Sequence, residues 1–381
     1  MTETQRVVTV RTLRGFADGF VSVALADHLL GLGYSPLRVG VVVTGTLIGS
    51  AVLTLVVGLV GHRLSFRTLL LGASVLMVAT GVGFFTVTAF APLFVIAVIG
   101  TLNPSAGDVS VFLPTEQAFL AGHATGAART RLYAIYNVGG NIAGAAGALL
   151  TSVLGGRAGF VVYTGVAVVT LLVYRGLPKE RPAPSGLTRP LEHSRTVVLQ
   201  LAALFSLDAA GGGFVVQSLL VLWLHLKFDL STVTTGAVFA ALGTFSAFSQ
   251  LLAPRLAERI GLIRTMVFTH LPANGFLVLA AFAPDAWLAV VLLMARALLS
   301  QMDVPARQAF VMAVVRPEER QAAASVTNVP RSLASAATPA LAGWLLSTGR
   351  LGWPLVIGGA CKAIYDVLLL LKFRDVEVDV G

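Results

Sequence analysis

The charged side chains within long apolar stretches are the residues of this sequence most able to do chemistry. In the first stretch, Arg11, Arg14, Asp18 and Ser22 recur every three or four positions, a spacing that places them on one face of a helix. If that helix spans a membrane, each buried charge costs at least about 2.5 kcal/mol and needs a partner or a wet cavity. This face is therefore not expected to contact lipid.

A second polar stripe lies near the end of the chain. Arg296, Asp303 and Arg307 fall within an apolar stretch near 286–314, again at a spacing that predicts one helical face. Asp303 and Arg307 stand four residues apart, where opposite charges can pair. The two stripes indicate polar paths or sites inside a helical protein.

The composition indicates that the helices carrying these stripes lie in a membrane. Hydrophobic residues make up 56% of the chain and charged residues 12%, and the mean hydropathy is +0.84. Soluble chains carry about 25% charged residues. The formal net charge of +9 comes from basic residues concentrated in alternate connections, as the positive-inside rule expects. We expect a multi-pass cell-membrane protein with both termini in the cytoplasm and no nucleic-acid partner.

A bilayer core needs about 20 apolar residues per helix, and twelve stretches meet that requirement. The sequence thus predicts an all-α membrane protein with twelve transmembrane helices. These stretches lie near 9–33, 37–61, 67–89, 91–120, 130–154, 158–176, 197–226, 232–253, 265–283, 286–314, 322–347 and 353–372.

The middle of the chain reads as a linker between two halves. Residues 178–195 are rich in proline and charge, which disfavours a packed helix. The predicted organisation is a six-helix half over 1–177, a cytoplasmic linker over 178–195 and a second six-helix half over 196–381.

Short matches between the halves predict a parallel repeat. An offset of 191 residues pairs Pro114 with Pro305 and Asn137 with Asn328. The same offset sets Glu116 opposite Arg307. A nearby offset of 194 sets Arg14 opposite Asp208. The halves thus place opposite charges at related positions.

Two such halves, with a loop signature between the second and third helix of each, resemble the major facilitator superfamily. The family pattern Gly-x-x-x-Asp-Arg-x-Gly-Arg-Arg corresponds here to 58–67, with His62 in place of the acid and Ser65 in place of the glycine. The copy at 254–264 keeps Glu258 and Arg259. His62 lacks a permanent negative charge, although it could change charge near neutral pH.

The resemblance implies roles for particular residues. The loop residues would form a conformational gate, comprising His62, Arg63, Arg67, Glu258 and Arg259. Helices one, four, seven and ten line the central cavity in this superfamily, which places most of the embedded polar residues on the substrate or proton pathway. The candidates are Arg14, Asp18, Asp108, Glu116, Asp208, Arg296, Asp303, Arg307, Arg331, Asn137 and Asn328.

Pairing between charges has two interpretations. Glu116 and Arg307 could approach each other near the cytoplasmic ends of helices four and ten in an outward-facing state. Alternatively, pairs within one helix would be purely structural. Such pairs are Arg14 with Asp18, Asp303 with Arg307, and Lys362 with Asp366.

Two segments are expected to interrupt helices. Proline removes a backbone donor, so the run 103–108 should break the fourth helix, either as a binding site or as a simple kink. Gly211–Gly213 suggests a hinge or a close contact in the seventh.

A glycine pattern marks the drug:proton antiporter branch of the family, and 140–147 matches its spacing without its proline. Close helix packing alone explains such glycines.

These features favour a secondary active transporter of a small solute that works by alternating access, with proton-coupled efflux as the first interpretation. A desolvated carboxylate such as Asp18, Asp108 or Asp208 could carry the proton. Uptake by symport or uniport of a small organic solute, which may carry negative charge, is the alternative. No histidine pair has metal-site spacing and no phosphate-binding loop is present, so we expect no enzyme activity, cofactor or metal, and a monomer.

Overall fold

The structure is a computed structural model, and the regular secondary structure in the part that it describes is α-helical apart from short 3-10 turns. The described residues are 1–60, 63–105, 111–123, 126–151, 153–154, 156–179, 193–316 and 319–374. The predicted site residues His62 and Asp108, and most of the predicted linker, fall outside these ranges.

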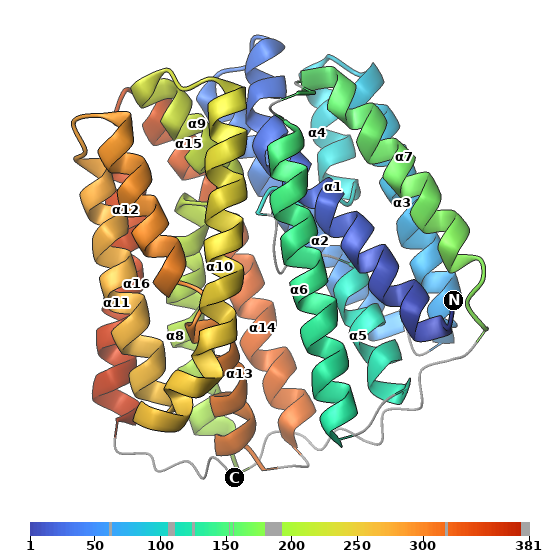
Figure 1. The fold of residues 1–381 in the computed structure, drawn as a ribbon, viewed down its shortest axis with the longest axis vertical. Helices are drawn as coiled ribbons and strands as arrows, with labels where there is room; N and C mark the ends of the chain where they lie inside the picture. The colour runs from blue at the N-terminus through green and yellow to red at the C-terminus, as the bar shows by residue number, and fades with distance from the viewer. Residues whose placement is uncertain are drawn as a thin grey trace. The chain divides into compact units, whose positions relative to one another are not determined.

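The described part of the chain forms sixteen helices, which Figure 1 labels in chain order. They are α1 (Glu3–Gly31), α2 (Pro36–Val60), α3 (Phe66–Thr86), α4 (Phe90–Ile99), α5 (Phe112–His123), α6 (Gly126–Leu150), α7 (Gly156–Tyr174), α8 (Arg195–Phe214), α9 (Gln217–Phe228), α10 (Thr232–Ile260), α11 (Leu262–Ala281), α12 (Ala286–Leu299), α13 (Asp303–Val314), α14 (Arg320–Ala337), α15 (Pro339–Ser347) and α16 (Trp353–Phe373).

Each predicted stretch coincides with one helix or with two consecutive helices. The expected break in the fourth stretch is confirmed, because α4 ends at Ile99 and α5 begins only at Phe112. The stretch near 286–314 was expected to form one transmembrane helix. It is divided between α12 and α13, and Pro305 lies in the first turn of α13, where a missing backbone donor is tolerated.

In the part of the chain that the structure describes, eight stretches are long and apolar enough to cross a membrane, as expected of a membrane protein. The count of twelve spans stays a prediction, since the remaining stretches are shorter or more polar, as α1 is with its embedded charges. The eight are Pro36–Val57, Phe66–Thr86, Gly156–Tyr174, Arg195–Phe228, Thr232–Ile260, Leu262–Ala281, Ala286–Val311 and Trp353–Phe373.

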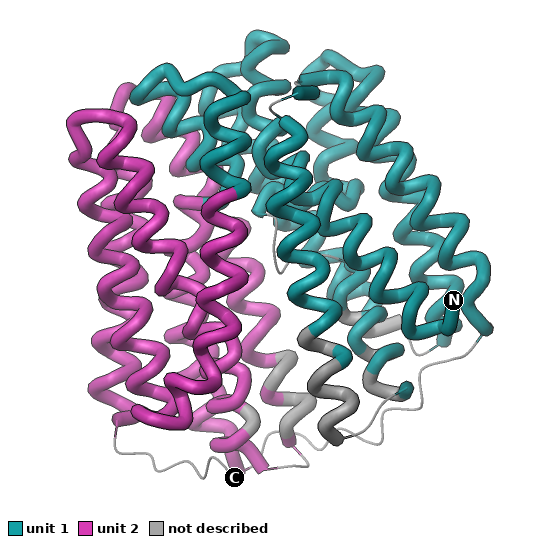
Figure 2. Tube along the Cα trace, in the orientation of Figure 1, with its two compact units in different colours: residues 1–185, 216–240 teal, residues 186–215, 241–381 magenta. Residues whose placement is uncertain are grey.

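The chain divides into two compact units, which Figure 2 colours separately. Unit 1 comprises 1–185 and 216–240, and unit 2 comprises 186–215 and 241–381. The segment 216–240 was expected with the second half of the chain but belongs to unit 1. Its helix α9 contacts α1, and the Ser218 hydroxyl donates to the Ser22 carbonyl at 2.8 Å.

Small residues bring α1 and α6 together in unit 1. A Cβ added at Gly15 would collide with the backbone of Gly140, and one at Gly19 with that of Gly144. Helix backbones approach this closely only where side chains are minimal. The glycines at 140–147 therefore have a packing role, in agreement with the interpretation that close helix packing alone explains them.

Unit 2 uses glycine in the same way on α8. A Cβ at Gly211 would meet the Gly358 carbonyl of α16 at 2.7 Å, and one at Gly213 would collide with the Ser335 carbonyl of α14. The expected close contact at the triple glycine is confirmed. The apolar core of unit 2 includes the buried side chains of Phe205, Met266 and Phe310.

Candidate functional site

Unit 1 buries an ion pair between two helices. Nη2 of Arg14 on α1 lies 2.7 Å from Oε2 of Glu116 on α5, and the two side chains are 2% and 0% exposed. Arg14 also lies over the ring of Phe112, at 3.9 Å from its centroid. A charge-assisted hydrogen bond in so dry a place is among the strongest that side chains make.

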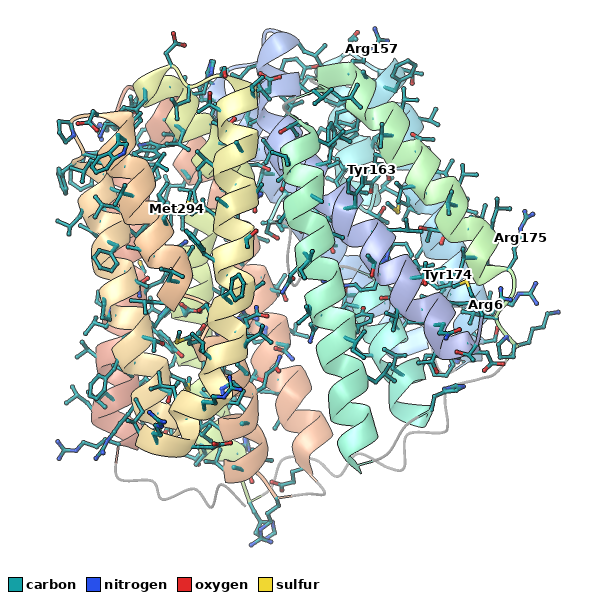
Figure 3. The ribbon with its side chains drawn as sticks, in the orientation of Figure 1. Arg6, Arg157, Tyr163, Tyr174, Arg175 and Met294 are labelled. Carbon is teal, nitrogen blue, oxygen red and sulfur yellow. The ribbon has the colours of Figure 1, made fainter. Side chains whose placement is uncertain are left out.

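Two tyrosines complete the surroundings of Glu116. The hydroxyls of Tyr136 on α6 and Tyr174 on α7 both donate to its carboxylate. Figure 3 labels Tyr174, whose helix α7 also contacts α1. Both oxygens of Glu116 thus accept hydrogen bonds from groups that keep their protons near neutral pH.

A second acid lies one turn along α1. Asp18 is buried and is hydrogen-bonded to the side chain of Asn103, which lies in the break between α4 and α5. Arg11, also buried, lies over the ring of Tyr136 at 5.5 Å. The polar stripe predicted on this helix therefore faces the interior of unit 1.

In unit 2, Asp208 on α8 joins three helices. Its Oδ1 lies 2.7 Å from Nζ of Lys362 on α16, and its Oδ2 lies 3.3 Å from Nη1 of Arg307 on α13. Arg307 also pairs with Asp303 at 3.4 Å, which confirms the predicted i,i+4 pair. All four side chains are buried.

A histidine and a second aspartate adjoin this group. Nδ1 of His270 on α11 lies 2.9 Å from Oδ1 of Asp366 on α16, and Nε2 lies 3.8 Å from Oδ1 of Asp208. The Asn274 amide donates to Oδ2 of Asp366 at 2.9 Å. Acidic, basic and titratable groups thus form one buried network in unit 2.

The other pathway candidates in the described part of the chain are less buried, and one of them, Arg296, interacts electrostatically with Asp208 and Asp303. Arg296 on α12 and Arg331 on α14 are half-buried, whereas Asn137 on α6 and Asn328 on α14 are exposed.

The predicted gate residues that the structure describes lie at or next to the ends of helices. Arg63, Glu258 and Arg259 are exposed and Arg67 is half-buried. The two loop copies differ at the position of the family glycine, where one has Ser65 and the other has Gly261, and each residue has a local reason. Ser65 caps α3 by accepting a hydrogen bond from the Thr68 amide. Gly261 begins α11 with φ +86°, which favours glycine.

Two predicted pairs differ in the structure. Lys362 and Asp366 were expected to pair along their own helix, but they pair with Asp208 and His270 respectively. Arg14 forms a 2.7 Å ion pair with Glu116 on another helix, in addition to its electrostatic interaction with Asp18.

Sequence reasoning missed His270, Asn274 and Tyr174 as members of these networks. A usable signal existed for two of them. His270 and Asn274 are four residues apart on one apolar helix, as are Lys362 and Asp366, so each pair predicts a shared polar face.

Comparison with family models shows which family this chain belongs to. A family model described as Major Facilitator Superfamily matches residues 7–298 and 209–380. The chain is 22% identical over 417 residues to an uncharacterized membrane protein of Saccharomyces cerevisiae, covering 97% of this chain and 93% of that protein.

Solved structures share the fold. The nucleoside transporter NupG has a TM-score of 0.76 at 14% identity, covering 98% of this chain and 100% of that one. A D-xylose-proton symporter has a TM-score of 0.74 at 14% identity, covering 97% of each chain. A human organic anion transporter has a TM-score of 0.66 at 18% identity, covering 98% of this chain and 99% of that one.

Proposed function

Because the chain belongs to the major facilitator superfamily, whose members carry small molecules across membranes, we propose that it is a proton-coupled secondary transporter working by alternating access. Export of the solute is the direction that we propose first. The protein would act as a monomer in the cell membrane, with both termini in the cytoplasm.

The observation that carries this proposal is the burial of ion pairs in both units. Arg14 with Glu116, and Asp208 with Lys362 and Arg307, are almost completely withdrawn from solvent. Buried ion pairs contribute little net stability, and apolar residues of similar volume often do better. Charges kept within membrane helices generally serve transport or proton movement.

We assign the substrate or proton pathway to the embedded polar residues and the gate to the loop residues. The pathway set is Arg14, Asp18, Asp108, Glu116, Asp208, Arg296, Asp303, Arg307, Arg331, Asn137 and Asn328. The gate set is His62, Arg63, Arg67, Glu258 and Arg259.

Uptake is the second candidate, and two observations favour it. The glycines that match the antiporter spacing are occupied in packing α6 against α1, so they give export no separate support. The fold is also similar to that of a D-xylose-proton symporter. An anionic solute would be compatible with the embedded arginines.

Proteoliposomes that contain a pH-sensitive dye test both the coupling and the direction. Cationic, neutral and anionic compounds are added in turn, with protein-free liposomes and the Asp208→Asn variant as controls. Antiport predicts that protons move against the solute, and symport predicts that they move with it. Solute movement with no proton movement would contradict the coupling.

A further inference from the structure

We propose that His270 and Asp366 together form a proton-binding site in unit 2, holding one proton between them. Nδ1 of His270 lies 2.9 Å and 3.1 Å from the two oxygens of Asp366. The side chains are 4% and 0% exposed. Proton binding by this pair can be tested by itself. Its role in transport rests on the proposed proton coupling.

Asp366 contacts His270, and its ion pairs in the described part of the chain include no permanently charged cation. The Asn274 amide adds a neutral donor. Lys362, one turn away on α16, binds Asp208 instead. With a neutral imidazole, the pair therefore buries one negative charge, which is costly in a dry interior.

The surrounding charges are already engaged with one another. Asp208 and Asp303 are balanced by Lys362 and Arg307 through direct ion pairs. Arg296 acts electrostatically on Asp208 and Asp303. The groups that face the pair are Asp208 on α8, Asn274 on α11, Arg307 on α13, and Lys362 and Tyr365 on α16.

The added proton has a defined place. Neutral His270 donates Nδ1–H to Asp366, which leaves the lone pair of Nε2 to accept a proton from a hydronium ion. The new N–H bond replaces one O–H bond of hydronium, which leaves as water, and the product is an imidazolium beside a carboxylate.

Protonation of His270 at Nε2 would place a positive charge next to Asp208. Nε2 of His270 lies 3.8 Å from the same Oδ1 that Nζ of Lys362 contacts at 2.7 Å. A second cation at that oxygen competes with Lys362 and redistributes the ion pairs that join α8, α13 and α16. Through this contact, a proton on the pair can change the packing of helices that carry pathway residues.

The test uses the proton itself as the probe, so no substrate is needed. Full-length protein in proteoliposomes on a solid-supported membrane receives pH jumps, and the transient charge displacement is recorded. The variants are His270→Gln and Asp366→Asn. The matched control is His28→Gln, a buried histidine on α1 with no ion pair in the described part of the structure.

We expect the displacement in the wild type and in His28→Gln, and its loss in both variants of the pair. An unchanged displacement in Asp366→Asn would overturn the site. If neither variant folds, wild-type protein is titrated by infrared difference spectroscopy. Imidazole and carboxylate bands that shift together in one pH step support the His270–Asp366 site. The absence of such a step overturns the site.

The two proposals fail in different ways. One outcome is a charge displacement after pH jumps that requires His270 and Asp366, without any solute-driven proton movement. That outcome would contradict proton-coupled transport and would leave the proton-binding site supported. Solute-driven proton movement that survives fully in Asp366→Asn would overturn the site and leave the proposed transport standing.

Discussion

The two units each bury an acid among cations and hydrogen-bond donors, but the partners differ in kind. Glu116 in unit 1 is bound by one arginine and two tyrosine hydroxyls. Asp208 in unit 2 contacts a lysine and an arginine and has a histidine within 4 Å. Arginine stays charged in proteins, whereas histidine changes charge near neutral pH. The partners of Glu116 therefore keep their protonation near neutral pH, whereas Asp208 has a histidine beside it that can exchange a proton.

The largest expected effect comes from removing the acid of unit 1. Glu116→Gln leaves Arg14 buried without its counter-charge, which costs about 3–5 kcal/mol of unfolding free energy. Denaturation of the purified protein in detergent measures this cost. Glu258→Gln, at an exposed site, serves as the control and should be close to neutral. Equal losses in the two variants would contradict a special role for the buried pair.

A smaller loss is expected in unit 2, where Asp208 has two cations. Lys362→Met removes one of them while Arg307 remains, so we expect a loss of about 1.5–3 kcal/mol, typical of a charged hydrogen bond. Combining it with Asp208→Asn should cost less than the sum of the two single changes, because both charges leave together. Strict additivity in a double-mutant cycle would contradict direct coupling.

The tyrosines of α7 test how the acid of unit 1 is held. Tyr174→Phe removes a hydrogen bond to Glu116 and should cost about 1.5 kcal/mol. Tyr163→Phe is a matched change on the same helix, since its hydroxyl meets the neutral Thr101 at 3.3 Å, and it should cost about 0.5 kcal/mol. Denaturation midpoints compare them, and a larger effect at Tyr163 would contradict the account.

Smaller effects than at the buried ion pairs are expected from serine caps at the starts of α3 and α10. Ser65 caps α3 with its side chain, and its replacement by alanine should cost about 1 kcal/mol. Ser231→Ala provides a comparison, since its hydroxyl accepts from the Thr234 amide at the start of α10. Similar small losses in thermal unfolding are expected. No loss at Ser65 would show that its cap does not matter.

The sequence predicted the positions of the helices well, because long apolar runs and proline breaks are local signals. The interruption at 103–105 followed from Pro104, and the i,i+4 pair of Asp303 and Arg307 followed from spacing. Partners across helices could not be predicted in this way. His270 and Asp366 are 96 residues apart, and only packing brings α11 beside α16.

The same limit explains the misassigned pairs. Lys362 and Asp366 lie one turn apart, and spacing alone favours pairing between them. Spacing does not show that α8 presents Asp208 to Lys362, or that α11 presents His270 to Asp366. The assignment of 216–240 to unit 1 likewise depends on contacts of α9 that leave no local pattern.

The most direct test of the central claim is solute-driven proton movement in proteoliposomes, measured for the wild type, Asp208→Asn and His28→Gln. Proton-coupled transport that requires Asp208 predicts proton movement with at least one class of solute in the wild type and in His28→Gln. It also predicts that this movement is lost in folded Asp208→Asn. Solute movement without protons in the wild type, or undiminished proton movement in Asp208→Asn, would contradict it.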